Sequence, residues 1–437
     1  MSLRAGLAEA DITPKVPVEK VGWLRRILAD TIVDPLYARA LVLESEAARI
    51  AFVALDVISV RWHQVCAIRS TAARLGIPET HVLVAATHNH AGPAVCSSGF
   101  TPRDDAYVGF MLERTAQALG RAAANLAPAR IAVASAIEGR VAFIRRYFMR
   151  DGSVRTHPPI ASPEIRCAEG VVDPEVGVLC VQDMAGKVRG LVVNFACHPT
   201  QHGGDTCISA GFPGQLSLAL KEQFGGDCVT LFLNGAFGNA HAANPLDPES
   251  TEDMRWIGAT LASDAARLVP QMGFRDAAAL SAQTAVVRLP LRDLAGPFGL
   301  AAEHQQMFGE EGVYDEMRRQ LERRRAERDH ELAEVQCVRI GDDTAFVGIP
   351  AEYFSQLALR IKMNSRVPNT FVVGAANGML GYVPHREAFE HGGYEVTLAG
   401  GSKLVPEAGD MLADAALDLL GRRSAHPRED GGCEREA

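Results

Sequence analysis

The chain has 437 residues, 47% of them hydrophobic and 22% charged, which is ordinary for a globular protein with one large domain or two closely packed ones. Its formal net charge of −9 offers no basic surface for nucleic acid or anionic lipid. No apolar run predicts a transmembrane segment or a signal peptide. The nine cysteines are widely spaced, without a CxxC pair, so we expect a reduced, cytoplasmic protein.

Short runs rich in Val, Ile and Phe, bounded by Gly, Pro or Asp, predict β-strands along most of the chain. In chain order they are 38–43, 50–55, 81–86, 131–136, 176–182, 190–196, 228–233, 278–289, 333–340, 344–349 and 370–373. Apolar residues at helical spacing predict helices over 59–75, 105–126, 214–224, 254–268, 300–331, 353–363 and 408–420. This alternation predicts an α/β fold, a layered sandwich of central mixed β-sheets covered by helices.

No repeat, low-complexity region or linker divides the chain. Residues 1–421 are therefore expected to form a single domain. Residues 422–437 carry Pro, Gly-Gly and many charges, and are predicted to be a disordered tail.

Two histidines, His88 and His90, follow the apolar strand at 81–86, and an Ala-Gly-Pro segment then ends regular structure. Side chains two apart on an extended backbone point the same way, so both imidazoles are expected to face one pocket. Neutral imidazole suits zinc. An HxH pair alone is a weak signal, and a surface or hydrogen-bonded pair stays open as an alternative.

A second apolar strand, at 190–196, is followed by His198 and His202. Their i, i+4 spacing is that of a helix-borne metal pair, but Pro199 and the glycine pair after His202 disfavour a helix. We therefore predict His198 as the ligand and keep His202 as an alternative. Histidines at two independent strand ends favour a zinc site.

Five segments of the chain form a recognisable set in a fixed order: residues 6–14 (GLAEADITP), 88–93 (HNHAGP), 194–200 (NFACHPT), 348–352 (GIPAE) and 381–382 (GY). Together they resemble the catalytic domain of the neutral, non-lysosomal ceramidases and their shorter bacterial relatives. The similarity runs from about residue 6 to the closing helix. It is specific as a set, although each piece is weak alone.

The resemblance implies that His88, His198, Glu352 and Tyr382 bind one zinc ion, Zn2+. Two imidazoles, a carboxylate and a phenol leave room for a water or a substrate oxygen, as a catalytic zinc site requires. Zinc lowers the pKa of a bound water to about 7. For Glu352, stabilisation of a helix N-terminus stays open as an alternative role. Tyr382 and Tyr394 could also be ordinary half-buried tyrosines.

The same resemblance implies substrate-facing roles for His90, Arg145 and Tyr394. His90 would lie beside the metal, contact the scissile amide and pass a proton to the leaving nitrogen. Arg145 and Tyr394 would hold the carbonyl oxygen as negative charge develops on it. A structural salt bridge stays open for Arg145, and Arg146 could take its place.

The sequence departs from the family pattern at several positions. Gly211 and Asn239 stand where the family has Asp, and Ile144 stands where relatives often have Asn. His241 falls near the family's serine, so we infer no serine nucleophile. We predict His241 as an added acid/base, with a replacement ligand or a loop histidine as alternatives. The C-terminal Ig-like sandwich domain of true ceramidases is not expected here, which weakens ceramide as the substrate.

We therefore predict a zinc-dependent hydrolase that cleaves an amide bond of an N-acyl or related small molecule. One alternative keeps the metal and acts as an esterase, lactonase or cyclic-amide hydrolase. Another is a catalytically silent ligand-binding relative, suggested by Gly211 and Asn239. The sequence indicates no protein partner and no oligomeric state.

Overall fold

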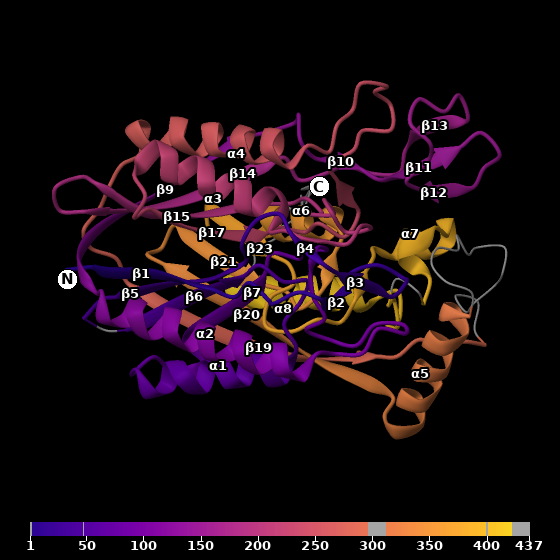
Figure 1. Ribbon diagram of the computed structural model, residues 1–437, viewed down its shortest axis with the longest axis horizontal. Helices are drawn as coiled ribbons and strands as arrows, with labels where there is room; N and C mark the ends of the chain where they lie inside the picture. The colour runs from indigo at the N-terminus through magenta and orange to yellow at the C-terminus, as the bar shows by residue number, and fades with distance from the viewer. Residues whose placement is uncertain (1, 47, 296–311, 399–400, 422–437) are drawn as a thin grey trace, which may run out of the picture.

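The computed structural model describes residues 2–46, 48–295, 312–398 and 401–421, and its largest sheet has eight strands (Figure 1). In spatial order they are β17 (Val229–Asn234), β15 (Val188–Phe195), β14 (Glu175–Asp183), β9 (Ala127–Ile137), β1 (Arg4–Asp11), β5 (Tyr37–Glu44), β6 (Arg49–Leu55) and β7 (Val82–Ala86). Only two residue pairs join β9 to β1, so the sheet has two four-stranded halves. Each half ends in a parallel pair, β15 with β17 and β6 with β7.

A second sheet packs face to face on the first. Its order is β19 (Leu280–Pro290), β20 (His330–Ile340), β21 (Thr344–Gly348) and β23 (Asn369–Val373). One hydrophobic cluster joins Phe52 and Leu231 of the large sheet to Phe346 and Phe371 of the small one. Several central strands, such as β14 and β21, are therefore almost continuously buried and read as uninterrupted apolar runs.

Helices cover the outer face of each sheet, which gives four layers. On the large sheet lie α1 (Trp62–Arg74), α2 (Asp105–Ala124), α3 (Gly211–Phe224) and α4 (Met254–Leu268). On the small sheet lie α6 (Ser355–Asn364) and α8 (Ala408–Leu420), and α5 (Val313–Glu327) stands beyond the end of the sheet and packs on the same cluster through Leu321. In Figure 1, α3 and α4 lie above the strands and α1 and α2 below them. The predicted layered α/β sandwich is confirmed.

Short elements complete the chain around the site. They are the strands β2 (Val18–Val21), β3 (Ile27–Ala29), β4 (Thr31–Ile32), β8 (Gly92–Pro93), β10 (Phe143–Ile144), β11 (Arg146–Met149), β12 (Val154–Thr156), β13 (Ile165–Ala168), β16 (Cys207–Ile208), β18 (Ala240–His241), β22 (Glu352–Tyr353) and β24 (Tyr382–Val383), the helix α7 (Arg386–His391), and the 3-10 turns η1 (Glu79–His81), η2 (Val269–Gln271) and η4 (Tyr394–Val396). Two-residue strands of this kind carry several of the predicted site residues.

Every strand predicted from the sequence is present, but some elements differ from the prediction. Strand β1 was not predicted, because its apolar residues are mostly Ala and Gly between charged residues. The helix predicted over 300–331 is wrong at its end, since α5 stops at Glu327 and β20 starts at His330. Residues 300–311 of that prediction and the tail 422–437 lie outside the described residues. The single domain over 1–421 stays a prediction, and no described helix is long and apolar enough to cross a bilayer.

Candidate metal centre

The loop after β7 carries His88 and His90, and its backbone is not extended. β7 ends at Ala86, and His88 has a φ of 66°, in the left-handed region that costs energy for a residue with a side chain. The alternation argument for this pair was therefore wrong. The two rings nevertheless lie together, with centroids 4.8 Å apart. Asn89 fixes the loop, because its amide donates to the carbonyl of Ser209 at 2.7 Å.

His198 follows β15 and joins the other two histidines. Its ring centroid lies 5.0 Å from that of His88 and 5.5 Å from that of His90. Asn234, the last residue of β17, explains this convergence. Its buried side-chain amide donates to the carbonyls of Thr87 at 3.0 Å and Cys197 at 2.9 Å, each one residue before a histidine.

All three rings turn Nδ1 toward a backbone carbonyl. The distances are 2.8 Å from His88 to Ile58, 2.7 Å from His90 to Gly22, and 2.9 Å from His198 to Phe237. Since a carbonyl only accepts, Nδ1 carries the proton and Nε2 keeps its lone pair. The Nε2 atoms of His88 and His90 are buried and form no hydrogen bond with the described residues. This arrangement is typical of metal-binding histidines.

Glu352 and Tyr382 lie side by side on the paired strands β22 and β24. The Oε2 atom of Glu352 is 3.4 Å from Nε2 of His88 and 3.4 Å from Nε2 of His198. The hydroxyl of Tyr382 is 3.3 Å from Nε2 of His198. The structure thus brings all four predicted zinc ligands together. His90 joins them, since the ligand atoms of His88, His90 and His198 lie within 4.8 Å of one another.

The protonation of the cluster suits a divalent cation. Burial, reinforced by Arg145, lowers the pKa of His198 to about 4, and burial also lowers that of His90 well below its usual value. Burial opposes the ionisation of Glu352, but contact with His88 and His198 holds its pKa well below the ordinary range. Neutral imidazoles beside an ionised carboxylate are the donor set that zinc prefers. The residues present therefore fit the metal.

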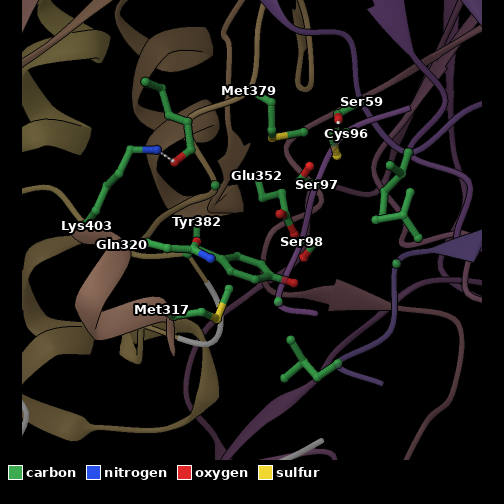
Figure 2. Close-up of a pocket in the computed structure, with 18 of the residues that line it drawn as sticks. Ser59, Cys96, Ser97, Ser98, Met317, Gln320, Glu352, Met379, Tyr382 and Lys403 are labelled. Carbon is green, nitrogen blue, oxygen red and sulfur yellow. Dashed lines mark hydrogen bonds between the residues drawn. The ribbon is translucent and has the colours of Figure 1, made fainter. Parts of the chain in front are cut away.

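The cluster opens into a cavity of about 640 Å³. Two further predicted site residues, His90 and Tyr394, line this cavity together with Glu352 and Tyr382. The rings of Tyr382 and Tyr394 meet edge to face, with centroids 5.8 Å apart. Figure 2 shows Glu352 and Tyr382 between α5, with Met317 and Gln320, and the loop with Ser97 and Ser98.

Arg145 does not line this cavity. Its guanidinium lies 5.2 Å from the centre of the Tyr382 ring. It donates to Glu395 Oε1 and to the carbonyl of Gly238, both at 2.7 Å. These contacts favour a role in positioning Tyr382 over the direct substrate contact that the sequence analysis predicted.

His241 does not line the cavity either. Its Nε2 lies 2.9 Å from Oγ1 of Thr200, and its Nδ1 accepts a hydrogen bond from the backbone of Ala243 at 3.1 Å. Both ring nitrogens are therefore engaged, which favours the loop-histidine alternative. His202 lies in a separate group with Asp205 and Cys207 and not with His198.

Sequence reasoning missed two residues of this region. Glu395 is fully buried and accepts hydrogen bonds from Arg145, Arg146 and Thr156. The only feature of the sequence that could have indicated Glu395 is its position next to Tyr394, a predicted site residue. For Asn234, the only indication in the sequence is that an amide side chain ends a strand of mostly apolar residues.

Neither the family models nor the curated proteins compared with this sequence match it. Among solved structures, the fold is similar to the crystal structure of neutral ceramidase from Pseudomonas aeruginosa, with a TM-score of 0.74 and 21% identity over 96% of this chain and 74% of that chain. It is also similar to a ceramidase complexed with C2, with a TM-score of 0.75 and 19% identity over 96% of this chain and 75% of that chain. The resemblance drawn from the sequence motifs is thus confirmed in the fold, and the chain has the architecture of a neutral ceramidase.

Proposed function

We propose that the chain is a zinc-dependent hydrolase that cleaves an amide bond of an N-acyl small molecule. The observation that carries the proposal is the set of histidines whose Nδ1 atoms are committed to backbone carbonyls while their Nε2 atoms face one another beside a carboxylate. The likeness of the fold to ceramidases, whose name denotes cleavage of an amide, favours this bond over other targets.

His88, His198, Glu352 and Tyr382 would hold the metal. When bound, zinc supplies a Lewis acid that lowers the pKa of a water molecule and polarises a carbonyl oxygen. Tyr382 is kept neutral by burial, which raises its pKa well above the usual value, so it offers a phenol oxygen and not a second negative charge. Arg145 fixes the ring of Tyr382 from behind.

The remaining cavity residues would act on the substrate. His90 has a fixed tautomer with a free Nε2 lone pair, so it can accept a proton from the attacking water and pass it to the departing nitrogen. Tyr394 lines the same cavity and is neutral, because burial raises its pKa, so its hydroxyl can donate to the carbonyl oxygen. In balance, a C–O bond forms to water, the C–N bond breaks, and the amine leaves with the proton.

Metal content and turnover test the proposal together. The purified protein is expected to hold about one zinc per chain and to hydrolyse members of a panel of N-acyl amides faster than the matched esters. His88→Ala and His198→Ala are expected to lose the metal and at least about 10³-fold in kcat/KM. His202→Ala, in the other histidine group, is the matched control and should keep both. Near-stoichiometric zinc in both ligand variants would contradict the assignment.

A further inference from the structure

The described part of the cavity wall contains more basic than acidic side chains. Among the described residues that line it, the lysine and arginine side chains are Arg61, Arg103, Arg323, Arg324 and Lys403. The carboxylate among these lining residues is that of Glu352, which is committed to the histidines. A pocket for a neutral lipid amide needs no such wall, because desolvating unpaired cations against an apolar ligand costs free energy.

Three of these arginines already have a carboxylate partner. Arg103 pairs with Asp105, Arg323 with Glu316, and Arg324 with Glu331. The excess charge therefore rests on the other two cations, Arg61 and Lys403. Neither forms an ion pair with any residue in the described part of the chain.

Arg61 and Lys403 come from distant parts of the sequence and are held on neighbouring carbonyls. Arg61, at the start of α1, donates to the carbonyl of Met379 at 3.0 Å. Lys403, shortly before α8, donates to the carbonyl of Leu380 at 2.7 Å, as the dashed line in Figure 2 shows. These carbonyls directly precede the Gly-Tyr segment that carries Tyr382. The two cations are thereby fixed in the wall that leads to the metal centre.

The environment of Lys403 indicates a missing anion. Burial lowers its pKa to about 7; Glu331 opposes this shift, whereas the positive charges of Arg324 and Arg61 add to it. A half-buried ammonium in such a field gains most from a ligand that brings its own negative charge.

We propose, building on the function proposed above, that the substrate is an amide bearing a carboxylate, which binds Arg61 and Lys403 while the amide lies at the metal centre. This class comprises N-acyl amino acids, with the carboxylate on the amine side, and monoamides of dicarboxylic acids, with the carboxylate on the acyl side. The two cations select for charge, and the cavity wall between them and Tyr382 sets the distance to the scissile bond.

Matched substrate pairs test this subsite in the metal-loaded enzyme. One arm compares N-acetyl amino acids with their C-terminal carboxamides, and the other compares N-succinyl anilide with N-butyryl anilide. In at least one arm, the carboxylate substrate is expected to have a kcat/KM about tenfold or more above that of its neutral twin, mainly through KM. The arm that responds identifies the side of the amide that carries the charge.

Two variants and a control locate the effect. Lys403→Met and Arg61→Gln are each expected to reduce the carboxylate-to-neutral ratio at least about fivefold. Arg318→Gln is the matched control, since Arg318 lies on α5, pairs with Glu322 and does not line the cavity. Equal kcat/KM values for the carboxylate and neutral substrates in both arms would contradict the subsite. A carboxylate-to-neutral ratio that is unchanged in both variants would contradict it as well. Either result would leave the hydrolase proposal unaffected.

If no amide is cleaved, the hydrolase proposal fails and calorimetric titration decides the subsite alone. The carboxylate member of a pair should then bind about tenfold more tightly than its twin and lose this advantage in Lys403→Met. Equal affinities, or no binding of either member, would overturn it.

Discussion

Two largely buried polar regions of the molecule differ in their hydrogen bonding. One is the cluster of His88, His90, His198 and Glu352. The other, the arginine network, comprises Arg145, Arg146, Glu169 and Glu395. In the cluster, the Nε2 atoms of His88 and His90 form no hydrogen bond with the described residues, although Oε2 of Glu352 lies 3.4 Å from Nε2 of His88. In the network, Glu395 accepts from Arg145 and Arg146 at 2.7 Å each, and Arg146 also pairs with Glu169. Buried polar groups are normally satisfied, so two imidazole nitrogens without hydrogen bonds in one cluster favour a ligand there, whereas the satisfied groups of the network favour a supporting role.

This difference assigns separate tasks to neighbouring residues. Under the proposed function the cluster binds an ion, whereas the network holds the segment of Tyr394 and the guanidinium of Arg145 against Tyr382 whether or not an ion is bound. Substitutions in the cluster should therefore change metal content or turnover. Substitutions in the network should first change the free energy of unfolding.

The largest expected effect short of metal loss is at His90. His90→Ala removes the free Nε2 that faces the substrate, so kcat should fall by about 10²–10⁴-fold while zinc stays bound. Metal analysis and steady-state kinetics on the same sample separate the two roles. If His90→Ala loses zinc together with activity, His90 is a metal ligand like His88 and His198 and not a substrate-facing base.

Glu395→Gln tests the support. Removing this charge leaves the buried guanidinium of Arg145 without its carboxylate partner and leaves Arg146 with Glu169 alone, which should cost about 3–5 kcal/mol in the free energy of unfolding. Urea unfolding at neutral pH measures the loss. Glu390→Gln, on the exposed side of α7, is the control and should change stability by no more than about 0.5 kcal/mol.

The same carboxyl gives a pH dependence. Burial opposes its charge, but Arg145 and Arg146 hold the pKa of Glu395 at about 2. A lowered pKa in the folded state stabilises the protein above the unfolded pKa, about 4.3, and this contribution disappears as the pH falls towards 2. The stability difference between the wild type and Glu395→Gln should therefore shrink over this range. A difference that stays constant would contradict the ion-pair account.

Asn234 supports the cluster from outside. Its side chain hydrogen-bonds both histidine loops, but it is not itself a proposed metal ligand. Asn234→Ala should weaken zinc binding by about 10–100-fold, as loss of an outer hydrogen-bonding partner does. Competition with a chelator measures the affinity. Asn194 is a matched control, because its buried amide joins the carbonyls of Leu233 and Val372 and touches neither histidine loop. Asn194→Ala should cost stability and leave zinc affinity unchanged.

His241 gives the smallest expected effect. Its ring nitrogens bond Thr200 and the backbone of Ala243, outside the cavity. His241→Gln should therefore change kcat/KM by less than about threefold, which corresponds to well under 1 kcal/mol. A fall of a hundredfold in kcat with full zinc content would restore the acid/base role that the sequence predicted.

The sequence predicted the central strands well, such as β14 and β21, because they are buried on both faces and read as apolar runs. It failed at β1, whose burial uses Ala and Gly and gives no such run. The four candidate metal ligands were predicted from local motifs at strand ends and from the family resemblance. The His88 loop shows the limit of local reasoning, since its rings converge through a left-handed backbone and not through strand alternation.

The supporting contacts could not be predicted from the sequence because they join segments that are far apart. Asn234 meets Thr87 across 147 positions, and Glu395 meets Arg145 across 250. The residues next to Asn234 and Glu395 in the sequence give no indication of these distant partners. For the same reason, a motif match could place Arg145 near the site but could not show that Tyr382 separates it from the cavity.

Diffraction at the zinc absorption edge, on crystals of protein purified without added metal, tests the central claim most directly. We predict one anomalous peak within about 2.0–2.3 Å of Nε2 of His88, Nε2 of His198 and a carboxylate oxygen of Glu352. No peak there, or a single peak at the His202, Asp205 and Cys207 group instead, would contradict the account.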